Sequence, residues 1–417
     1  MKTCALVCCL MVAGLYSYSQ TTWYQITTGT DKKLNAIDFP TALIGYIGGD
    51  DSLLMKTLDG GQSWNAISYS GITFYPGEEN IINLQFVTSE IGYCAVGPYS
   101  GIYKTTDGGL NWTQVTPAGN LCYNEGLFFF DESNGFLAGS GCFQGELIEK
   151  MTGGTLANAT LNFPGLSALE RITDMDFLNT DYGMASSSGG RFYRTTDGGL
   201  NWDSIPSTLG NGIPITSVEL INDTLVFAGY DNAGSGFGLL RSDDSGLTWY
   251  EDINSATFYY PAYHCVYHAP DGKVYAGAQP SVLNSGLIFE SADFTNWMYY
   301  DVDQAIYDMS ASNDSTVFGV GDSGYVVVNQ NPSVLSQQSF MADFNFEVFP
   351  NPARDILHLS SPSGNQEMQI LILDMKGDIV MNCSEGSEII ISDLKSGLYF
   401  LQVSSGDQVA QLKFIKY

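Results

Sequence analysis

Thr195-Thr196-Asp197-Gly198-Gly199-Leu200-Asn201-Trp202 is one of four complete copies of a motif that returns along this chain. The shared pattern is Ser/Thr-x-Asp-x-Gly-x-x-Trp, with its defining residues at Asp59, Gly61, Trp64, Asp107, Gly109, Trp112, Asp197, Gly199, Trp202, Asp244, Gly246 and Trp249. A fifth copy keeps Asp293 and Trp297 but lacks the glycine and one residue. A sixth is eroded to Thr152-Gly153-Gly154, with Ala157 at the tryptophan position. Such repetition indicates an architecture built from equivalent units.

The spacing of the motif predicts the unit. Its last position falls at residues 64, 112, 157, 202, 249 and 297, so neighbouring copies are 48, 45, 45, 47 and 48 residues apart. This period fits one four-stranded β-propeller blade per repeat. The expected blade starts are Leu34, Ile82, Tyr123, Ile172, Ile215, Tyr263 and Ala305. We therefore predict an all-β chain with a seven-bladed propeller over residues 20–330.

The last expected blade, residues 305–329, lacks an outer strand of its own. The run Trp23-Tyr24-Gln25-Ile26 resembles Trp112-Thr113-Gln114-Val115 and is expected to supply that strand from the N-terminal end. Closing the ring in this way removes sheet edges that otherwise promote aggregation. It also places all six tryptophans at equivalent positions.

The motif has a structural role that involves no substrate. Its aspartate and hydroxyl can accept hydrogen bonds from the N–H groups of a tight turn, and glycine adopts the positive φ that such a turn requires. Its tryptophan buries a large apolar area. We therefore expect the aspartates to be turn clamps and not catalytic carboxylates.

These residues resemble the Asp-box, or BNR, repeats of sialidases, sortilin-type receptors, xyloglucanases and photosystem II assembly-factor-like propellers. The doubled glycine of Asp107-Gly108-Gly109 and Asp197-Gly198-Gly199 is most similar to the last group, which implies a binding scaffold. A sialidase would need three converging arginines for the substrate carboxylate. Arg191, Arg194 and Arg241 occupy blade positions, and Arg171-Ile172-Thr173 lacks the proline of that family's motif. We expect no sialidase.

The formal charge of −29 excludes partners that are themselves polyanions, because a phosphate backbone recruits Lys and Arg. Nucleic acid and anionic membrane surfaces are therefore not expected as partners. A hydrolase of a neutral polysaccharide stays open, since it needs only two carboxylates across a cleft. The candidates are Asp50, Asp51, Glu170, Asp231 and Asp308. The aromatic tract at residues 257–263 could stack on sugar rings or be buried between blades.

No cofactor or metal is expected. His264 and His268 share a strand face only if that strand is regular, and the cysteines show no zinc-type spacing. Glycine pairs follow aspartate inside turns and open no phosphate-binding helix.

The N-terminal residues 1–19 are typical of a secretory signal, with Lys2 ahead of a short apolar core. No later segment is apolar enough for a transmembrane helix. In an oxidising compartment one cysteine pair is predicted. The hairpin around residues 131–134 pairs residues whose numbers sum to about 265, so Cys122 and Cys142 are expected to face each other and form a disulfide.

A second domain is expected at residues 345–417, after a linker at residues 331–344. About seven short strands fit a small Ig-like sandwich. The domain resembles the type A C-terminal sorting domain of the type IX secretion system. The resemblance rests on residues 349–355, 372–377, 393–400 and 413–416, which include Pro350, Asn351, Pro352, Asp355, Gly377, Gly397 and Tyr399. It implies the type IX machinery as a partner and export through the periplasm to the cell surface or beyond.

The sequence therefore favours an exported, non-enzymatic binding or adhesion propeller with an extracellular glycan or protein ligand. The alternative is an exported glycoside hydrolase. The two differ in whether a pair of acidic residues converges in a cleft.

Overall fold

The computed structural model describes residues 22–115, 121–141, 145–162, 170–210, 212–231, 238–253, 261–280, 285–330, 347–350, 353–360, 369–373, 379–383, 388–395, 397–405 and 408–416. These residues form β-strands and one short 3-10 helix, Asp322–Gly324. Within these ranges no helix is long and apolar enough to cross a membrane.

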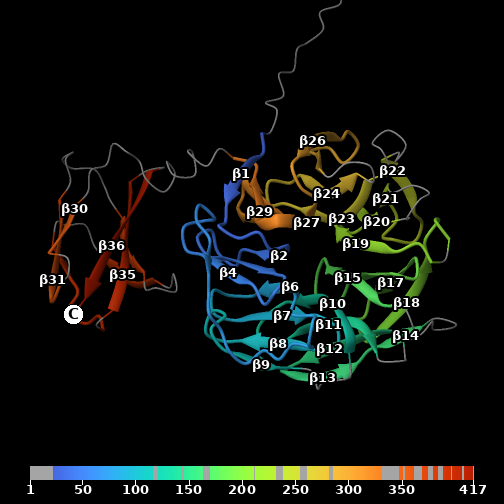
Figure 1. Cartoon of the computed structure of the whole chain (residues 1–417), viewed down its shortest axis with the longest axis horizontal. Helices are drawn as coiled ribbons and strands as arrows, with labels where there is room; N and C mark the ends of the chain where they lie inside the picture. The colour runs from blue at the N-terminus through green and yellow to red at the C-terminus, as the bar shows by residue number, and fades with distance from the viewer. Residues whose placement is uncertain are drawn as a thin grey trace, which may run out of the picture.

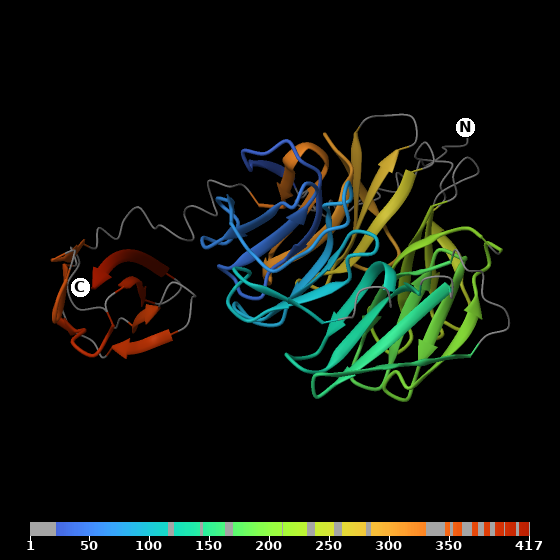
Figure 2. The ribbon, with the colours of Figure 1, turned by 60° about the horizontal axis from the view of Figure 1, so that its bottom comes forward.

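The strands of residues 24–328 form seven antiparallel sheets, one of which gains a parallel strand. Figures 1 and 2 show these sheets following one another around a ring. In chain order, the first sheet contains β2 (Leu34–Asp38), β3 (Gly45–Gly49), β4 (Leu54–Thr57) and β5 (Asn65–Ala66). The second contains β6 (Ile81–Phe86), β7 (Gly92–Val96), β8 (Ile102–Thr105) and β9 (Trp112–Gln114). The third contains β10 (Leu121–Phe129), β11 (Gly135–Gly141), β12 (Gly145–Thr152) and β13 (Thr155–Asn158).

The fourth sheet contains β15 (Ile172–Phe177), β16 (Gly183–Ser187), β17 (Arg191–Thr195) and β18 (Asn201–Pro206), with β14 (Thr160–Asn162) parallel to β18. The fifth contains β19 (Ile215–Leu220), β20 (Val226–Tyr230), β21 (Gly238–Ser242) and β22 (Tyr250–Ile253). The sixth contains β23 (Pro261–His268), β24 (Val274–Pro280), β25 (Gly286–Ser291) and β26 (Met298–Val302). The last sheet is β27 (Ile306–Asn313), β28 (Thr316–Gly321), β29 (Tyr325–Val328) and β1 (Tyr24–Thr27). Every sheet begins within two residues of an expected blade start.

The N-terminal strand completes the last sheet. β1 pairs antiparallel with β29, with Tyr24 opposite Val328 and Thr27 opposite Tyr325. Trp23 packs edge-on against Tyr275 of β24, with ring centroids 5.8 Å apart. Trp202 packs in the same way against Phe136 of β11, at 6.0 Å. In both cases the tryptophan contacts the second strand of the preceding sheet, as its predicted equivalence requires.

The hydrophobic core lies between neighbouring sheets. One cluster joins Leu34 and Trp64 of the first sheet to Phe318 and Val326 of the last, and the N-terminal Ile26 belongs to it. Six further clusters join the remaining neighbours around the ring. Because each sheet buries both of its faces, its second strand reads as a continuous apolar and glycine run.

The motif turns carry the predicted hydrogen bonds. In the third complete copy, the Asp197 carboxylate accepts from the backbone N–H of Leu200 and Asn201, each at 3.0 Å. The Thr195 hydroxyl accepts from the N–H of Gly199 at 2.9 Å. Gly199 has φ +74°, and a Cβ there would lie 2.3 Å from the Phe136 ring of the preceding sheet. The motif thus both holds its turn by hydrogen bonds and packs against the preceding sheet.

The fifth copy shows how the turn survives without its glycine. Phe294 adopts the positive φ, at 61°. Asp293 still accepts from the N–H groups of Thr295 at 3.0 Å and Asn296 at 2.7 Å. The carboxylate therefore holds the turn where glycine is absent.

The C-terminal strands form two sheets of their own. One contains β30 (Glu347–Phe349), β31 (Ile356–Ser360) and β34 (Glu388–Ile390); the other contains β32 (Gln369–Leu373), β33 (Ile379–Cys383), β35 (Gly397–Ser405) and β36 (Gln408–Lys416). Leu357 and Ile389 of the first share one core with Ile370 and Leu401 of the second. The seven described strands agree in number with the sequence prediction. The sorting-motif residues Asn351, Pro352 and Gly377 lie outside the described residues.

The cysteine prediction falls partly outside the described residues. In the β10–β11 hairpin Leu127 faces Leu137, which gives a sum of 264 in place of the predicted 265. Two register irregularities bring Leu121 opposite Gly141 at the open end. Cys122 is buried there, but Cys142 lies outside the described residues, and no disulfide joins two cysteines within them. The pairing of Cys122 with Cys142 stays a prediction.

Candidate functional site

The first strand of each propeller sheet lines a central channel of about 690 Å³. Seven acidic side chains face this space against two cationic ones, Lys33 and Arg171. The acidic residues are Asp38, Glu125, Asp174, Asp176, Glu219, Asp231 and Asp308. A channel of this charge disfavours anionic ligands.

Most of these carboxylates hold one sheet to the next. Asp308 accepts from the backbone N–H of Ile37 on the following inner strand, at 2.8 Å. Four more carboxylates accept a hydrogen bond from a backbone N–H of the following sheet: Asp38 from Phe86 at 2.6 Å, Asp174 from Val218 at 2.9 Å, Asp176 from Leu220 at 2.7 Å and Glu219 from His268 at 2.9 Å. The Gln85 amide oxygen accepts from the N–H of Phe129 in the same way, at 2.7 Å. The inner edge of a blade has unpaired N–H groups, and these side chains satisfy them. Asp308, a sequence candidate for hydrolysis, is therefore engaged as an inter-sheet clamp.

Burial in the channel wall changes the protonation of the clamps. Desolvation raises the pKa of Asp38, Asp174 and Asp308 from the ordinary 3.8 to about 7, although backbone N–H donors oppose it. The opposite occurs in the exposed motif turns, where hydrogen bonds from the Asn201 side chain and backbone lower the pKa of Asp197 to about 2. The two groups of aspartates therefore respond to different pH ranges.

The propeller is expected to be more stable at pH 5 than at pH 8. A carboxyl whose folded pKa is raised binds a proton in the folded chain that the unfolded chain lacks between about pH 4 and 7, so its contribution is lost as pH rises through that window. Asp107, Asp197, Asp244 and Asp293 of the motif turns, whose pKa values are lowered, lose their contribution only below about pH 4. Urea unfolding followed by tryptophan fluorescence measures the difference.

The matched variants are Asp308→Asn in the channel and Asp314→Asn in an exposed turn of the same sheet. Both replace one titratable carboxyl group by an amide, but only the first should flatten the pH dependence. Equal slopes for the two variants, or a lower unfolding midpoint at pH 5 than at pH 8, would contradict the assignment.

The other carboxylate candidates make separate contacts in the described part of the chain. Asp50 accepts from the Asn35 amide at 2.8 Å, and Asp51 lies 3.9 Å from Lys32 on the surface. Glu170 faces Arg191 at 4.0 Å. Asp231 lines the channel, where burial raises its pKa. Glu170 Oε2 and Asp231 Oδ1 are both buried without a hydrogen-bond partner in the described part of the chain.

The arginines and histidines also serve separate contacts. Arg194 lies over Tyr182 at 5.2 Å and Arg241 over Phe227 at 5.7 Å, while Arg171 is at the channel mouth. No three arginines converge among these contacts. His264 sits at a register irregularity of β23, and burial, followed by the charge of Lys33, lowers its pKa to about 4. No group of three or more His, Cys, Asp or Glu suited to a metal ion occurs in the described ranges.

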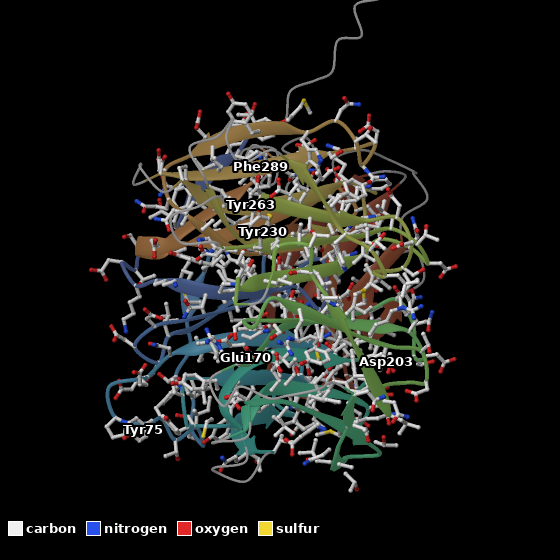
Figure 3. All side chains as sticks on the ribbon, turned by 90° about the vertical axis from the view of Figure 1, so that its right-hand side faces the viewer. Tyr75, Glu170, Asp203, Tyr230, Tyr263 and Phe289 are labelled. Atoms are coloured by element: carbon white, nitrogen blue, oxygen red, sulfur yellow. The ribbon has the colours of Figure 1, made fainter. Side chains whose placement is uncertain are left out.

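The predicted aromatic tract does not form an exposed platform in its described part. Tyr263 is fully buried and packs against Phe289 at 5.2 Å; Figure 3 shows both inside the molecule, near Tyr230. Residues 257–260 lie outside the described residues. The burial alternative therefore applies to Tyr263.

An exposed tyrosine cluster lies elsewhere. Tyr75, Tyr99 and Tyr123 are 52%, 49% and 41% exposed, with neighbouring ring centroids 5.4 and 6.1 Å apart. Figure 3 shows Tyr75 at the edge of the molecule. The cluster borders a depression of about 350 Å³ whose lining is Glu78, Asn80, Ile82, Pro98, Tyr123, Asn124, Glu125, Ser140 and Arg171. We call the three tyrosines and this depression the tyrosine groove.

The groove opens beside the channel. Ile82, Glu125 and Arg171 line both spaces. Glu125 accepts from Arg171 Nε at 2.7 Å, and the guanidinium lies over the Tyr123 ring at 5.7 Å. Sequence reasoning missed this site because its members come from a linker, a turn and a strand of three different repeats. The only local signal was Tyr99 in the turn Pro98-Tyr99-Ser100-Gly101, where no core position calls for an aromatic residue.

Two family models match parts of the chain. Residues 347–417 match the secretion system C-terminal sorting domain, and residues 15–121 match the photosynthesis system II assembly factor YCF48. No curated protein matches the chain.

Solved structures are similar in fold. YCF48 bound to D1 peptide is 16% identical with a TM-score of 0.56, covering 75% of this chain and 97% of that one. YCF48 from Cyanidioschyzon merolae is 16% identical with a TM-score of 0.55, covering 73% of this chain and 98% of that one. An ancestral GH74 enzyme is 13% identical with a TM-score of 0.54, covering 95% of this chain and 64% of that one. At these identities the likeness concerns the fold alone.

The C-terminal match indicates export to the cell surface or beyond and implies the type IX secretion machinery as a partner. The motif turns, the sheets and the YCF48 matches agree on the rest. The chain is an all-β protein with a β-propeller fold, in which residues 15–121 match the YCF48 assembly-factor family and residues 347–417 match the secretion system C-terminal sorting domain.

Proposed function

We propose that this protein is an exported, non-enzymatic binding or adhesion module whose propeller captures a ligand at the channel mouth. The observation that carries the proposal is the use of the channel carboxylates. Asp38, Asp174 and Asp308 each accept a backbone N–H from the next sheet, so they are occupied in the resting fold. The groups left at the mouth, Arg171 and the tyrosine groove, are suited to recognition.

A glycoside hydrolase is the second candidate, and two observations favour it. Glu170 Oε2 and Asp231 Oδ1 are buried without a hydrogen-bond partner among the described residues, and an ancestral GH74 enzyme is similar in fold. Against it, Glu170 faces Arg191 while Asp231 lines the channel, and none of the cavities described above is lined by both carboxylates. A retaining or inverting enzyme needs its two carboxylates across one bond.

The experiment is a binding screen of the exported chain, residues 20–417. Immobilised polysaccharides, glycans and peptides are the probes; peptides belong in the screen because YCF48 has been solved with one. We expect retention on at least one class of probe. Absence of retention on all of them would reject the proposed function.

The domain limits belong to the same proposal. The signal is placed at residues 1–19, the propeller at 20–330, the linker at 331–344 and the sorting domain at 345–417. Seven sheets between residues 24 and 328 support a ring of seven blades, and the two C-terminal sheets with a common core support an Ig-like sandwich.

A further inference from the structure

We propose that the tyrosine groove binds a neutral polysaccharide chain, with Tyr99 as its central stacking residue. This inference deepens the proposed function and rests on it, because it names the site and the chemical class of the ligand. It does not depend on the clamp carboxylates Asp38, Asp174 and Asp308.

The three rings come together from separate parts of the chain. Tyr75 lies in the connection between β5 and β6, Tyr99 in the turn between β7 and β8, and Tyr123 in β10. The Tyr75 N–H donates to the Ser100 hydroxyl at 2.8 Å, and the Tyr99 N–H donates to the Cys122 carbonyl at 2.8 Å. Backbone contacts thus hold all three tyrosines in one row, although none of the rings is needed in a core.

Tyr99 occupies an unfavourable backbone conformation. Its φ is +63°, a region that costs free energy for a bulky side chain. Its ring is 49% exposed, so core packing does not offset that cost. Strained residues of this kind cluster at ligand-binding sites. The conformation positions an aromatic face toward solvent at the centre of the row.

The lining supplies hydrogen-bonding groups beside the rings. Asn124 is fully buried, and its Oδ1 has no partner among the described residues, while its Nδ2 makes only a long 3.4 Å contact to the Val96 carbonyl. Arg171 donates from its Nε to Glu125, and within the described ranges its terminal nitrogens have no hydrogen bond that would compete with a ligand. Exposed aromatic faces next to convergent donors and acceptors suit a hydroxyl-rich ligand, which has apolar C–H faces and polar edges.

Charge selects among such ligands. Glu78 and Glu125 line the groove with Arg171, in a chain of formal charge −29. These negative charges would repel an acidic polysaccharide, and Arg171, the one cation of the groove lining, is already paired with Glu125. An apolar peptide side chain would favour a dry pocket, whereas six of the nine lining residues are polar or charged. A neutral glycan meets neither obstacle.

The test uses the exported chain with four soluble probes: xyloglucan, mixed-linkage β-glucan, xylan and, as the acidic comparison, polygalacturonate. Affinity electrophoresis and calorimetry compare the wild type with Tyr99→Ala, Tyr99→Phe and Tyr299→Ala. Tyr299 is the matched control, because it is 50% exposed on β26, away from the groove. Tyr99→Ala should weaken binding to a neutral probe about tenfold, while Tyr99→Phe, which keeps the ring, and Tyr299→Ala should stay near the wild type.

Circular dichroism and the thermal midpoint show whether the variants fold, and Tyr75→Ala is the second variant if Tyr99→Ala does not. Binding of a neutral probe that is equal in Tyr99→Ala and Tyr299→Ala overturns this inference but leaves the proposed function intact. Binding of peptides alone, lost in Tyr99→Ala, overturns the ligand class and leaves the site. Failure of every neutral probe also overturns the inference, and only failure of all probe classes rejects the proposed function.

Discussion

A chain that begins at Gly29 is expected to lose its cooperative propeller transition or to unfold at a much lower urea concentration than one that begins at Thr22. The truncation removes β1, which pairs with β29 through four residues and carries the buried Ile26. Its loss exposes the β29 edge and part of the cluster that joins the first and last sheets. Unpaired edges of this kind also promote aggregation.

The chain beginning at Thr22 is the control, because it keeps β1 and lacks only the residues before it. Tryptophan fluorescence follows the propeller, since all six tryptophans lie at residues 23–297. Adding a peptide of residues 21–29 to the shorter chain should restore part of the lost stability by strand addition. Coincident transitions for the two chains would mean that β1 does not close the ring.

Replacing Trp202 by alanine should destabilise the propeller by about 3–5 kcal/mol, the range for truncating a large buried aromatic side chain. Trp202 is 0% exposed and contacts both Phe136 of the preceding sheet and Phe177 of its own, at 6.0 and 5.6 Å. Its indole N–H also donates to the Gly199 carbonyl at 3.2 Å. Urea unfolding of the exported chain measures the change in the free energy of unfolding.

Leu200→Ala is the control in the same turn. Leu200 is 58% exposed, so its truncation should change the free energy of unfolding by no more than about 0.5 kcal/mol. A cost for Trp202→Ala as small as that of Leu200→Ala would show that the motif tryptophans do not hold neighbouring sheets together.

The features that the sequence predicted well are those determined by local chemistry. The turn of residues 195–202 needs its hydroxyl, carboxylate, glycine and tryptophan at fixed spacing, so each copy marks one sheet. The equivalence of Trp23 with the motif tryptophans was likewise visible in the run from Trp23 to Ile26. It placed the closing strand correctly because the same packing position requires the same residue type.

The candidate site could not be predicted in the same way. Asp308 and Asp231 look alike in sequence, yet one accepts the Ile37 N–H across a sheet boundary and the other has a buried oxygen without a partner among the described residues. Asp308 lies within β27, the first strand of its sheet, whereas Asp231 follows β20, the second strand of its sheet. The tyrosine groove depends on contacts among three repeats, and such contacts leave no period in the sequence.

If the propeller binds its ligand without cleaving it, bound polysaccharide should stay intact. The measurement is the release of reducing ends from the polysaccharide that the exported chain retains best. Wild type, Glu170→Gln and Asp231→Asn are incubated with that polysaccharide, and bound protein and released ends are read from the same sample. We expect all three proteins to be retained, with no release of reducing ends above that of a protein-free control. Release by the wild type that either substitution abolishes would contradict it and establish a hydrolase.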